Sequence, residues 1–136
     1  NDKKVTRIIL CSGKIFYDLY EEREKNKINE IKIIRLEQLY PFPEKNLSNL
    51  LVKSPNAEIV WCQEEPMNMG AWSFVRDHIE KTMEKIKMKN KITKYIGRGS
   101  AASPATGTTK RHLIEQKEII NEALNISNKQ QNAAAE

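Results

Sequence analysis

The sequence predicts an α/β domain with an open, mostly parallel sheet of four to five strands and helices on both faces. Short apolar runs rich in β-branched residues alternate with amphipathic segments of roughly 10–15 residues, the pattern of strands joined by helical crossovers. The runs are nearly continuous in hydrophobicity, as in strands buried on both faces. A length of 136 residues, with 39% hydrophobic and 30% charged residues, fits one domain with one core.

The first strand is expected over residues 5–12, where VTRIILCS is short and apolar. Gly13 breaks the run, and a helix is expected over residues 14–26, with its apolar positions at helical spacing. These positions are Ile15, Phe16, Leu19 and Tyr20. IKIIRL, residues 31–36, is the second expected strand. Pro43 suits the first turn of the next helix, and Pro55 marks its exit.

EIVWCQ, residues 58–63, is the third expected strand, and residues 70–86 form the third helix. The apolar side of that helix consists of Trp72, Val75, Ile79, Met83 and Ile86. A fourth strand is expected over residues 91–98 and a closing helix over residues 108–125. The apolar positions of the closing helix are Leu113, Ile114, Ile120 and Leu124, with residues 115–119 supplying the turn between them.

Three further expectations concern the limits of the domain and its environment. Residues 5–125 form a single domain, flanked by flexible tails at residues 1–4 and 126–136. No apolar run approaches the roughly 20 residues of a membrane helix, and the N-terminus lacks the pattern of a signal peptide. Cys11 and Cys62 end apolar runs, so both are expected to be buried free thiols.

The net charge of +5 does not by itself indicate a nucleic-acid partner. The densest basic cluster, KTMEKIKMKNK at residues 81–91, includes a glutamate and no aromatic side chain. It is interpreted as a solvated helix face and loop, so neither a nucleic-acid nor a membrane partner is expected.

Ligands of open α/β sheets bind beyond the carboxyl ends of the strands. The stretch CSGK lies at such an end, where backbone N–H groups of a helix start and the Lys14 ammonium would hold a phosphate. The alternative is that Ser12 caps the helix and Gly13 relieves the turn. Arg35 ends the neighbouring strand and Arg98 offers a third cation, so an anion site from Ser12 to Lys14 with these arginines is a hypothesis.

Residues 97–107, GRGSAASPATG, form a second candidate stretch, a long loop of small side chains. Such a loop is typically functional or packed against a neighbour, and its small residues permit close backbone approach. Its hydroxyl and guanidinium donors, with the adjoining threonine, are Arg98, Ser100, Ser103, Thr106 and Thr109. An anion site and a subunit interface both remain open for it.

The stretch WCQEEPMNMGAW, residues 61–72, contains adjacent carboxylates at Glu64 and Glu65. Neighbouring residues of an extended chain point in opposite directions, which argues against a catalytic pair. Gln63 or Glu65 is expected to hydrogen-bond neighbouring loops. The large apolar side chains of this stretch are expected in a core or an interface: Met67, Met69 and Trp72.

The histidines predict no metal or catalytic site. His78 and His112 lack a partner at metal-ligand spacing and are expected at the surface or as caps. No nucleophile is accompanied by a base and an orienting group. An independent enzyme that borrows this fold would need such a set, so catalytic, cofactor-binding and metal sites are not expected within the chain.

Five motifs occur in order over residues 5–126: CSGKIFYDL, IIRLEQLYPFP, WCQEEPMNMGAW, YIGRGSAASPATG and KRHLIEQKEIINEALN. Together they closely resemble the C-terminal domain of the thiamine-diphosphate-dependent decarboxylating component of 2-oxoglutarate dehydrogenase. The resemblance implies a transketolase C-terminal-like fold. Two positions depart from the family pattern: Gly99 stands where a proline often follows the YIGR arginine, and Met69 stands where PxNQGAW has glutamine.

The resemblance implies a role within a larger oxidoreductase of the tricarboxylic acid cycle, 2-oxoglutarate dehydrogenase (succinyl-transferring). That enzyme decarboxylates 2-oxoglutarate on thiamine diphosphate with Mg²⁺ and passes the succinyl group to the lipoyl arm of a succinyltransferase component. The cofactor sites lie mainly in preceding domains, so this domain is expected to build the homodimer and to be inactive alone. A bacterial cytoplasm or a mitochondrial matrix is the expected location.

In some family members the C-terminal lobe also contributes to a site for a nucleotide effector, AMP or acetyl-CoA. The alternative function is therefore a regulatory module that binds an anionic nucleotide. The residues assigned to that role are Ser12, Gly13, Lys14, Arg35 and Arg98.

Overall fold

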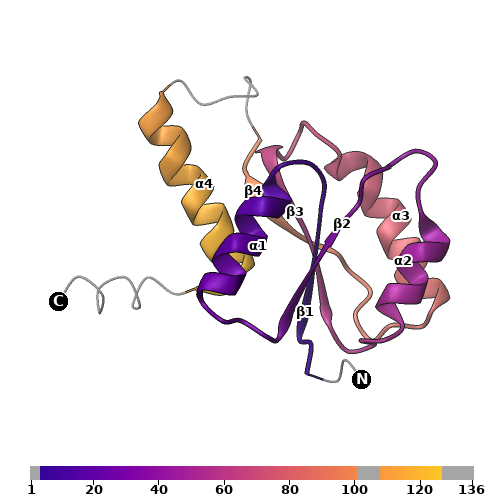
Figure 1. Cartoon of the computed structure of the whole chain (residues 1–136). Helices are drawn as coiled ribbons and strands as arrows, with labels where there is room; N and C mark the ends of the chain where they lie inside the picture. Colours follow the sequence, from indigo (N-terminus) through magenta and orange to yellow (C-terminus); the bar gives the residue numbers. More distant parts are fainter. Residues whose placement is uncertain (1–3, 101–107, 127–136) are drawn as a thin grey trace.

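The computed structural model describes residues 4–100 and 108–126, in which strands and helices alternate as predicted (Figure 1). The elements run in the order β1 (Arg7–Cys11), α1 (Ile15–Lys25), β2 (Ile31–Arg35), α2 (Glu44–Leu51), β3 (Glu58–Pro66), α3 (Trp72–Lys85), β4 (Lys94–Arg98) and α4 (Thr109–Ala123). None of the helices within these residues is long and apolar enough to cross a membrane. The predicted tails fall almost entirely outside the described residues.

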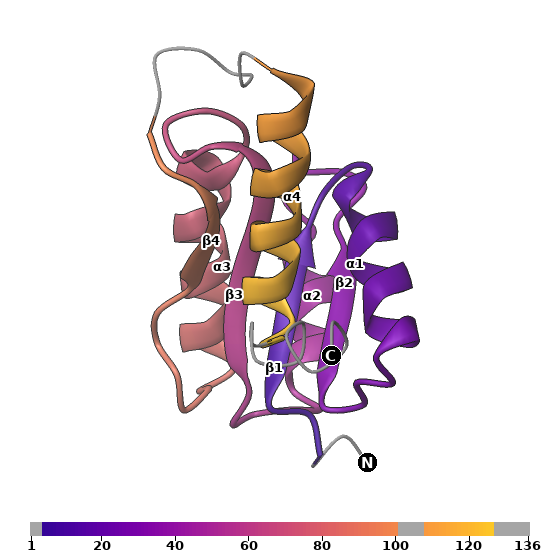
Figure 2. The ribbon, with the colours of Figure 1, turned by 90° about the vertical axis from the view of Figure 1, so that its left-hand side faces the viewer.

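The four strands form one parallel sheet in the order β2-β1-β3-β4. Arg7 at the start of β1 lies beside Ile31 of β2 and Glu58 of β3, so these three strands begin together. Helices α1 and α4 cover one face of the sheet and α2 and α3 cover the other (Figures 1 and 2). The predicted α/β class, with a parallel sheet between two helical layers, is confirmed.

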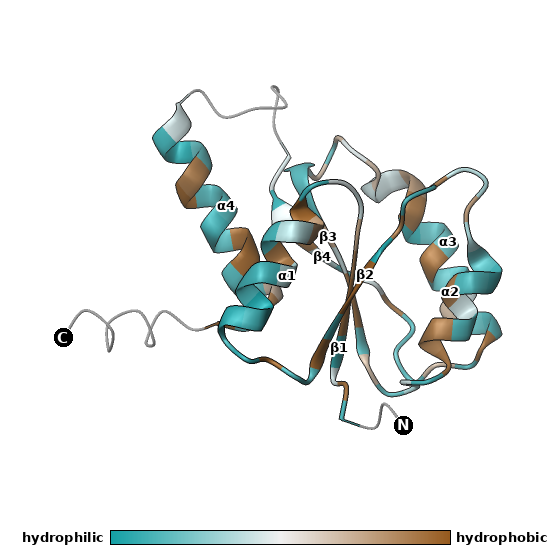
Figure 3. Ribbon diagram, in the orientation of Figure 1, coloured by the Kyte–Doolittle hydropathy of each residue, from teal (hydrophilic) through white to brown (hydrophobic). Residues whose placement is uncertain are grey.

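Two apolar cores lie on opposite faces of the sheet, because successive side chains of a strand point to opposite sides. Strand β1 is buried throughout, with Ile8 and Leu10 in one core and Ile9 and Cys11 in the other. The first core includes Trp61 of β3 and the inner faces of α2 and α3, and the second includes the inner faces of α1 and α4. Figure 3 shows the hydrophobic residues gathered on the strands between the two layers.

Strand β3 is longer than the sequence predicts. It runs to Pro66, past the predicted end at residue 63. Its pairing with β4 is irregular between Cys62 and Pro66 and then resumes, with Pro66 beside Arg98 and the Met67 amide donating to the Arg98 carbonyl at 3.0 Å. Proline is tolerated here because it sits at an irregularity and at the end of the strand.

Helix α4 packs differently from the prediction. Leu113 and Ile114 were expected to face the core, but their side chains are 63% and 51% exposed. The buried residues of this helix are Ile119 and Ala123. The first turns of α4 extend past the carboxyl ends of the strands, so only its C-terminal half has sheet to cover (Figures 1 and 2).

Arg7 connects the first strand to the last helix. Its side chain is buried, and its Nε donates to Glu58 Oε2 at 2.9 Å. Its Nη1 donates to the backbone carbonyls of Glu122 at 3.1 Å and Ala123 at 2.9 Å. These carbonyls belong to the last turn of α4, where a cation is favourable because the helix dipole is negative there.

Candidate functional site

The carboxyl ends of the strands carry most of the residues that the sequence singles out. At the end of β1, Gly13 adopts a φ of +82°, a left-handed conformation that glycine enters without strain. The predicted relief of the turn by Gly13 is confirmed. Lys14, rather than Ser12, takes the N-cap position of α1, and within the described residues the N-cap side chain makes no capping hydrogen bond. The alternative of a Ser12 cap is therefore wrong, and the exposed Lys14 immediately precedes the helix.

Arg35 lies beside this turn, because its place in the sheet is next to Cys11. Its Nη1 donates to the hydroxyl of Tyr17 at 3.2 Å, and its guanidinium carbon lies 5.3 Å from the Tyr17 ring centre and 6.0 Å from that of Phe16. The carboxylate that it approaches, Glu37, is 3.9 Å away and 81% exposed. Two aromatic rings of α1 thus hold a cation whose charge is only weakly neutralised.

A pocket of about 330 Å³ opens on the other side of Arg35, between the end of β2 and α2. Its floor is apolar and its rim is polar, a composition typical of small-molecule sites. The lining residues are Ile34, Arg35, Leu36, Glu37, Gln38, Pro43, Asn46, Leu47 and Leu50.

Arg98 does not join Arg35. The two arginines end the two outer strands of the described sheet, three strand spacings or roughly 14 Å apart. Arg98 lies instead in a pocket between β4 and α4, where its Nε is 3.2 Å from Glu115 Oε2. This arrangement separates Arg98 from the other residues of the hypothesised anion site. Of the remaining small-residue stretch, residues 101–107, with Ser103 and Thr106, lie outside the described residues.

Gln63 organises the loop between β3 and α3. Its side chain is buried, and its Oε1 accepts from Trp61 Nε1 at 2.9 Å and from the Trp72 amide at 3.1 Å. Its Nε2 donates to three carbonyl oxygens of the loop: those of Glu65 at 3.1 Å, Pro66 at 2.9 Å and Met69 at 2.9 Å. The predicted hydrogen bonding between Gln63 and the loop is confirmed, and the number of these bonds exceeds what the sequence indicates.

The two carboxylates of this stretch serve different neighbours. Glu64 accepts a hydrogen bond from Gln116 of α4 at 2.9 Å. Glu65 lies against Gly70, where an added Cβ would come within 3.1 Å of the Glu65 carboxylate. Gly70 also has a φ of +67°. The two acids therefore do not face a common substrate position, as the alternation of an extended chain predicts.

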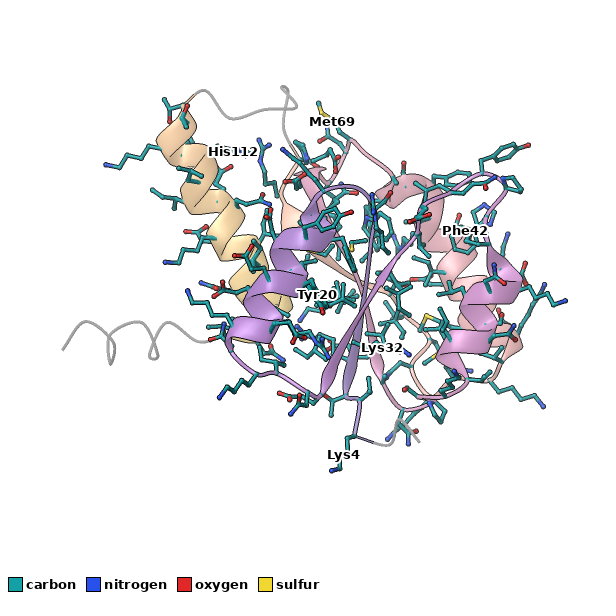
Figure 4. All side chains as sticks on the ribbon, in the orientation of Figure 1. Lys4, Tyr20, Lys32, Phe42, Met69 and His112 are labelled. Carbon is teal, nitrogen blue, oxygen red and sulfur yellow. The ribbon has the colours of Figure 1, made fainter. Side chains whose placement is uncertain are left out.

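The apolar residues of the loop divide between core and surface. Trp72 is buried, packs on Tyr95 at 5.2 Å between ring centres, and belongs to the first core, as predicted. Met67 is 40% exposed, so its expected place in a core is wrong and its place in an interface stays a prediction. Met69 is half-buried at the tip of the same loop (Figure 4).

A tight contact between β3 and β4 was not anticipated from the sequence. A Cβ on Gly97 would lie 2.6 Å from the Tyr95 hydroxyl and 2.7 Å from the Gln63 carbonyl oxygen, distances that no side chain tolerates. The Tyr95 hydroxyl donates to the Arg98 carbonyl at 2.6 Å, and burial raises the pKa of this tyrosine. The available signal was the glycine itself, because glycine inside a strand often marks a close approach.

The histidines and cysteines lie either at the surface or in packed positions. His112 is exposed on α4, as expected (Figure 4). His78 is instead half-buried between Phe42 and Phe74, with ring centres 4.9 Å away in both cases, so packing rather than capping explains it. Both cysteines are buried free thiols, as predicted, and burial raises the pKa of Cys11 to about 12 and that of Cys62 further still.

A site for thiamine diphosphate with its Mg²⁺ would need ligands for the metal ion. A protein binds Mg²⁺ with phosphates through carboxylate or other oxygen ligands that converge on the ion. Across residues 4–100 and 108–126, no group of three or more His, Cys, Asp or Glu side chains could hold a metal ion. No step of a thiamine reaction is assigned to these residues.

The sequence matches the family model described as "2-oxoglutarate dehydrogenase C-terminal" over residues 1–124. Proteins named "2-oxoglutarate dehydrogenase E1 component" from Brucella anthropi, Brucella ovis and Brucella canis are each 51% identical to it over 123 residues. The alignments cover 90% of this chain and 12% of each relative, so the chain spans about an eighth of their length. The chain belongs to the family of 2-oxoglutarate dehydrogenase C-terminal domains.

Proposed function

We propose that this chain is the structural and dimerisation domain at the C-terminal end of a 2-oxoglutarate dehydrogenase E1 component. In that role it supports the oxidative decarboxylation of 2-oxoglutarate and succinyl transfer to lipoyl groups, and it is not catalytic alone. Its partners are the preceding domains of the same polypeptide, a second copy, and the lipoyl-bearing succinyltransferase component. Thiamine diphosphate and Mg²⁺ bind elsewhere in the parent enzyme, in a bacterial cytoplasm or a mitochondrial matrix.

The proposal is supported by the hydrogen bonds that the polar residues at the carboxyl edge of the sheet make within the domain. Gln63 satisfies the backbone of its own loop, Glu64 accepts from Gln116, and Glu115 accompanies Arg98. These groups stabilise the junction of strands and helices, whereas a catalytic centre needs polar groups that converge on a reacting atom. The 51% identity to E1 components over this segment supports the parent reaction.

Two assays test the proposal. The 136-residue chain, given 2-oxoglutarate, thiamine diphosphate and Mg²⁺, is expected to release no CO₂, while the full polypeptide that contains it turns over. Sedimentation equilibrium of the full polypeptide, with and without residues 5–126, is expected to show weaker dimerisation in the truncated form. Turnover by the short chain would overturn the non-catalytic role, and an unchanged dimerisation constant would overturn the dimerisation role.

We infer a second candidate function, binding of an anionic nucleotide effector such as AMP or acetyl-CoA, from the environment of Arg35. Its guanidinium is fixed by Tyr17 beside the turn of Ser12, Gly13 and Lys14, and its Nε is buried without a hydrogen-bond partner in the described part of the chain. A fixed guanidinium grips phosphate in bidentate fashion, and the neighbouring pocket offers an apolar surface for a base.

Calorimetry of the full polypeptide with AMP and with acetyl-CoA tests this function. Arg35→Ala is expected to weaken binding by about 10-fold or more, since charge-assisted hydrogen bonds contribute roughly 1.5–3 kcal/mol. Arg98→Ala removes the same charge from the far edge of the sheet and is the matched control, expected to leave affinity unchanged. Equal affinities of the wild type and Arg35→Ala would remove Arg35 from any effector site.

A further inference from the structure

The first six residues of α4, 109–114, are not buried by the rest of the described chain. Every residue from 109 to 114 is exposed, including Leu113 and Ile114. The helix is held locally: the Thr108 side chain accepts from the Arg111 amide at 3.2 Å, and Arg111 Nε lies 3.3 Å from Glu115 Oε1. A capped helical segment with apolar side chains and no packing partner in the described chain is typical of an interaction surface.

One ridge of this segment carries an ordered set of side chains. Lys110, Ile114 and Glu118 are spaced four residues apart, so they form one row along the helix. All three are exposed. Its side chains are positive, apolar and negative in turn toward the C-terminus, and Glu118 also lines the pocket between β4 and α4. Figure 3 shows the hydrophobic band within the projecting part of the helix.

When a second copy of this row runs in the opposite direction, its negative end meets the positive end of the first and the apolar side chains meet in the middle. We propose that two copies of this chain pair through their α4 helices, crossing antiparallel at Ile114, with Lys110 of each copy facing Glu118 of the other. The pairing rests on the dimerisation role proposed above and names the surface that performs it. Rows of this spacing interlock when helices cross at about −50°, the commonest packing of helices in globular proteins.

The symmetry of the charges favours a second copy over another partner. A two-fold contact requires each patch to complement itself, and this row meets the requirement with two opposite-charge pairs flanking one apolar contact.

A cysteine placed at the crossing point gives a direct test in the full polypeptide. Ile114→Cys is expected to form a disulfide between copies under mild oxidation, because α-carbons at a close helix crossing come within the roughly 4.4–6.8 Å that a disulfide spans. Ile92→Cys, at a 72% exposed position before β4, is the control. Cys11 and Cys62 are buried and do not compete. The rate of 114–114 linkage, identified by mass spectrometry, is expected to exceed the 92–92 rate by about tenfold or more.

A second experiment reverses the charges at positions 110 and 118 in the Ile114→Cys background and measures the rate of 114–114 disulfide formation. Lys110→Glu and Glu118→Lys are each expected to slow it by about two- to tenfold, as expected for exposed ion pairs. Lys110→Glu combined with Glu118→Lys is expected to restore it within about twofold, and Lys81→Glu on α3 controls for net charge. Linkage no faster than at position 92, or a double variant as slow as the singles, would overturn the pairing. If the polypeptide still sediments as a dimer, either result overturns only the α4 pairing and not the dimerisation role. If the wild type is a monomer, both the pairing and the dimerisation role are overturned.

Discussion

Replacing Gln63 tests whether the loop after β3 depends on one buried amide. Gln63→Ala removes two hydrogen bonds accepted by Oε1 and three contacts donated by Nε2. An amide has two N–H hydrogens, so the three donated contacts amount to about two hydrogen bonds. Four hydrogen bonds at about 1 kcal/mol each predict a loss of about 4 kcal/mol in the free energy of unfolding. Urea unfolding followed by fluorescence of the two tryptophans, both at this site, measures the loss.

Gln63→Glu separates the donor from the acceptor at the same position. The introduced carboxylate would face three carbonyl oxygens, so the folded state favours the protonated acid, and the pKa of the new carboxyl group rises above the roughly 4.3 of an unfolded chain. The stabilisation by the protonated acid is then fully present below the unfolded-state pKa of roughly 4.3 and is lost as the pH rises through the higher pKa of the folded state. The deficit of this variant relative to the wild type should be smaller at about pH 4 than at about pH 7.

A matched control defines what would refute this reasoning. Gln38 is exposed and donates a hydrogen bond to the Tyr40 carbonyl. Gln38→Ala is expected to cost less than about 0.5 kcal/mol, as surface substitutions usually do. If Gln63→Ala costs no more than this control, or if the Gln63→Glu deficit is the same at both pH values, the amide does not hold the loop.

The remaining predictions concern stability and thiol reactivity. Arg7→Met should lower the free energy of unfolding by about 2–4 kcal/mol, since it removes the donor of the Glu122 and Ala123 carbonyls and the closer cation of Glu58, and hydrogen exchange should show the loss first in α4. Gly97→Ala should cost about 2 kcal/mol or more by forcing β3 and β4 apart, whereas Gly99→Ala, which has nothing within 4 Å of its Cβ, should be nearly neutral in the same urea titration. Cys11 and Cys62 should react with an alkylating reagent at about pH 8 only after urea unfolding, because burial raises the pKa of both thiols; labelling of the folded chain at the unfolded rate would contradict their burial.

The alternation of strands and helices was predictable because it depends on local hydrophobic periodicity. The continuous apolar run of β1 predicted burial on both faces, and the whole strand is buried. The interior of α3 was equally clear, since Val75, Ile79 and Met83 share one face and are fully buried. Such patterns extend over ten or fifteen consecutive residues, so they can be recognised without knowing which elements pack across the sheet.

The errors arose where long-range geometry decides. Leu113 and Ile114 have helical spacing, but whether they meet a core depends on where the sheet ends beneath α4. Arg35 and Arg98 both end strands, yet the strand order places them on opposite edges. Gln63 could be assigned to the loop from its position, but its five contacts depend on how residues 61–72 fold around its side chain. Topology, register and element length are properties that local periodicity does not carry.

The link from Arg7 to the end of α4 has a consequence for how the polypeptide is made. The guanidinium belongs to the first strand, and its backbone acceptors lie 115 and 116 residues later. During translation β1 leaves the ribosome long before Glu122 and Ala123 are synthesised, so the guanidinium at the start of β1 has to stay hydrated until then. A nascent chain interrupted before residue 122 would lack the α4 carbonyls that accept from Arg7. Such truncated products should be rapidly recognised by chaperones and proteases.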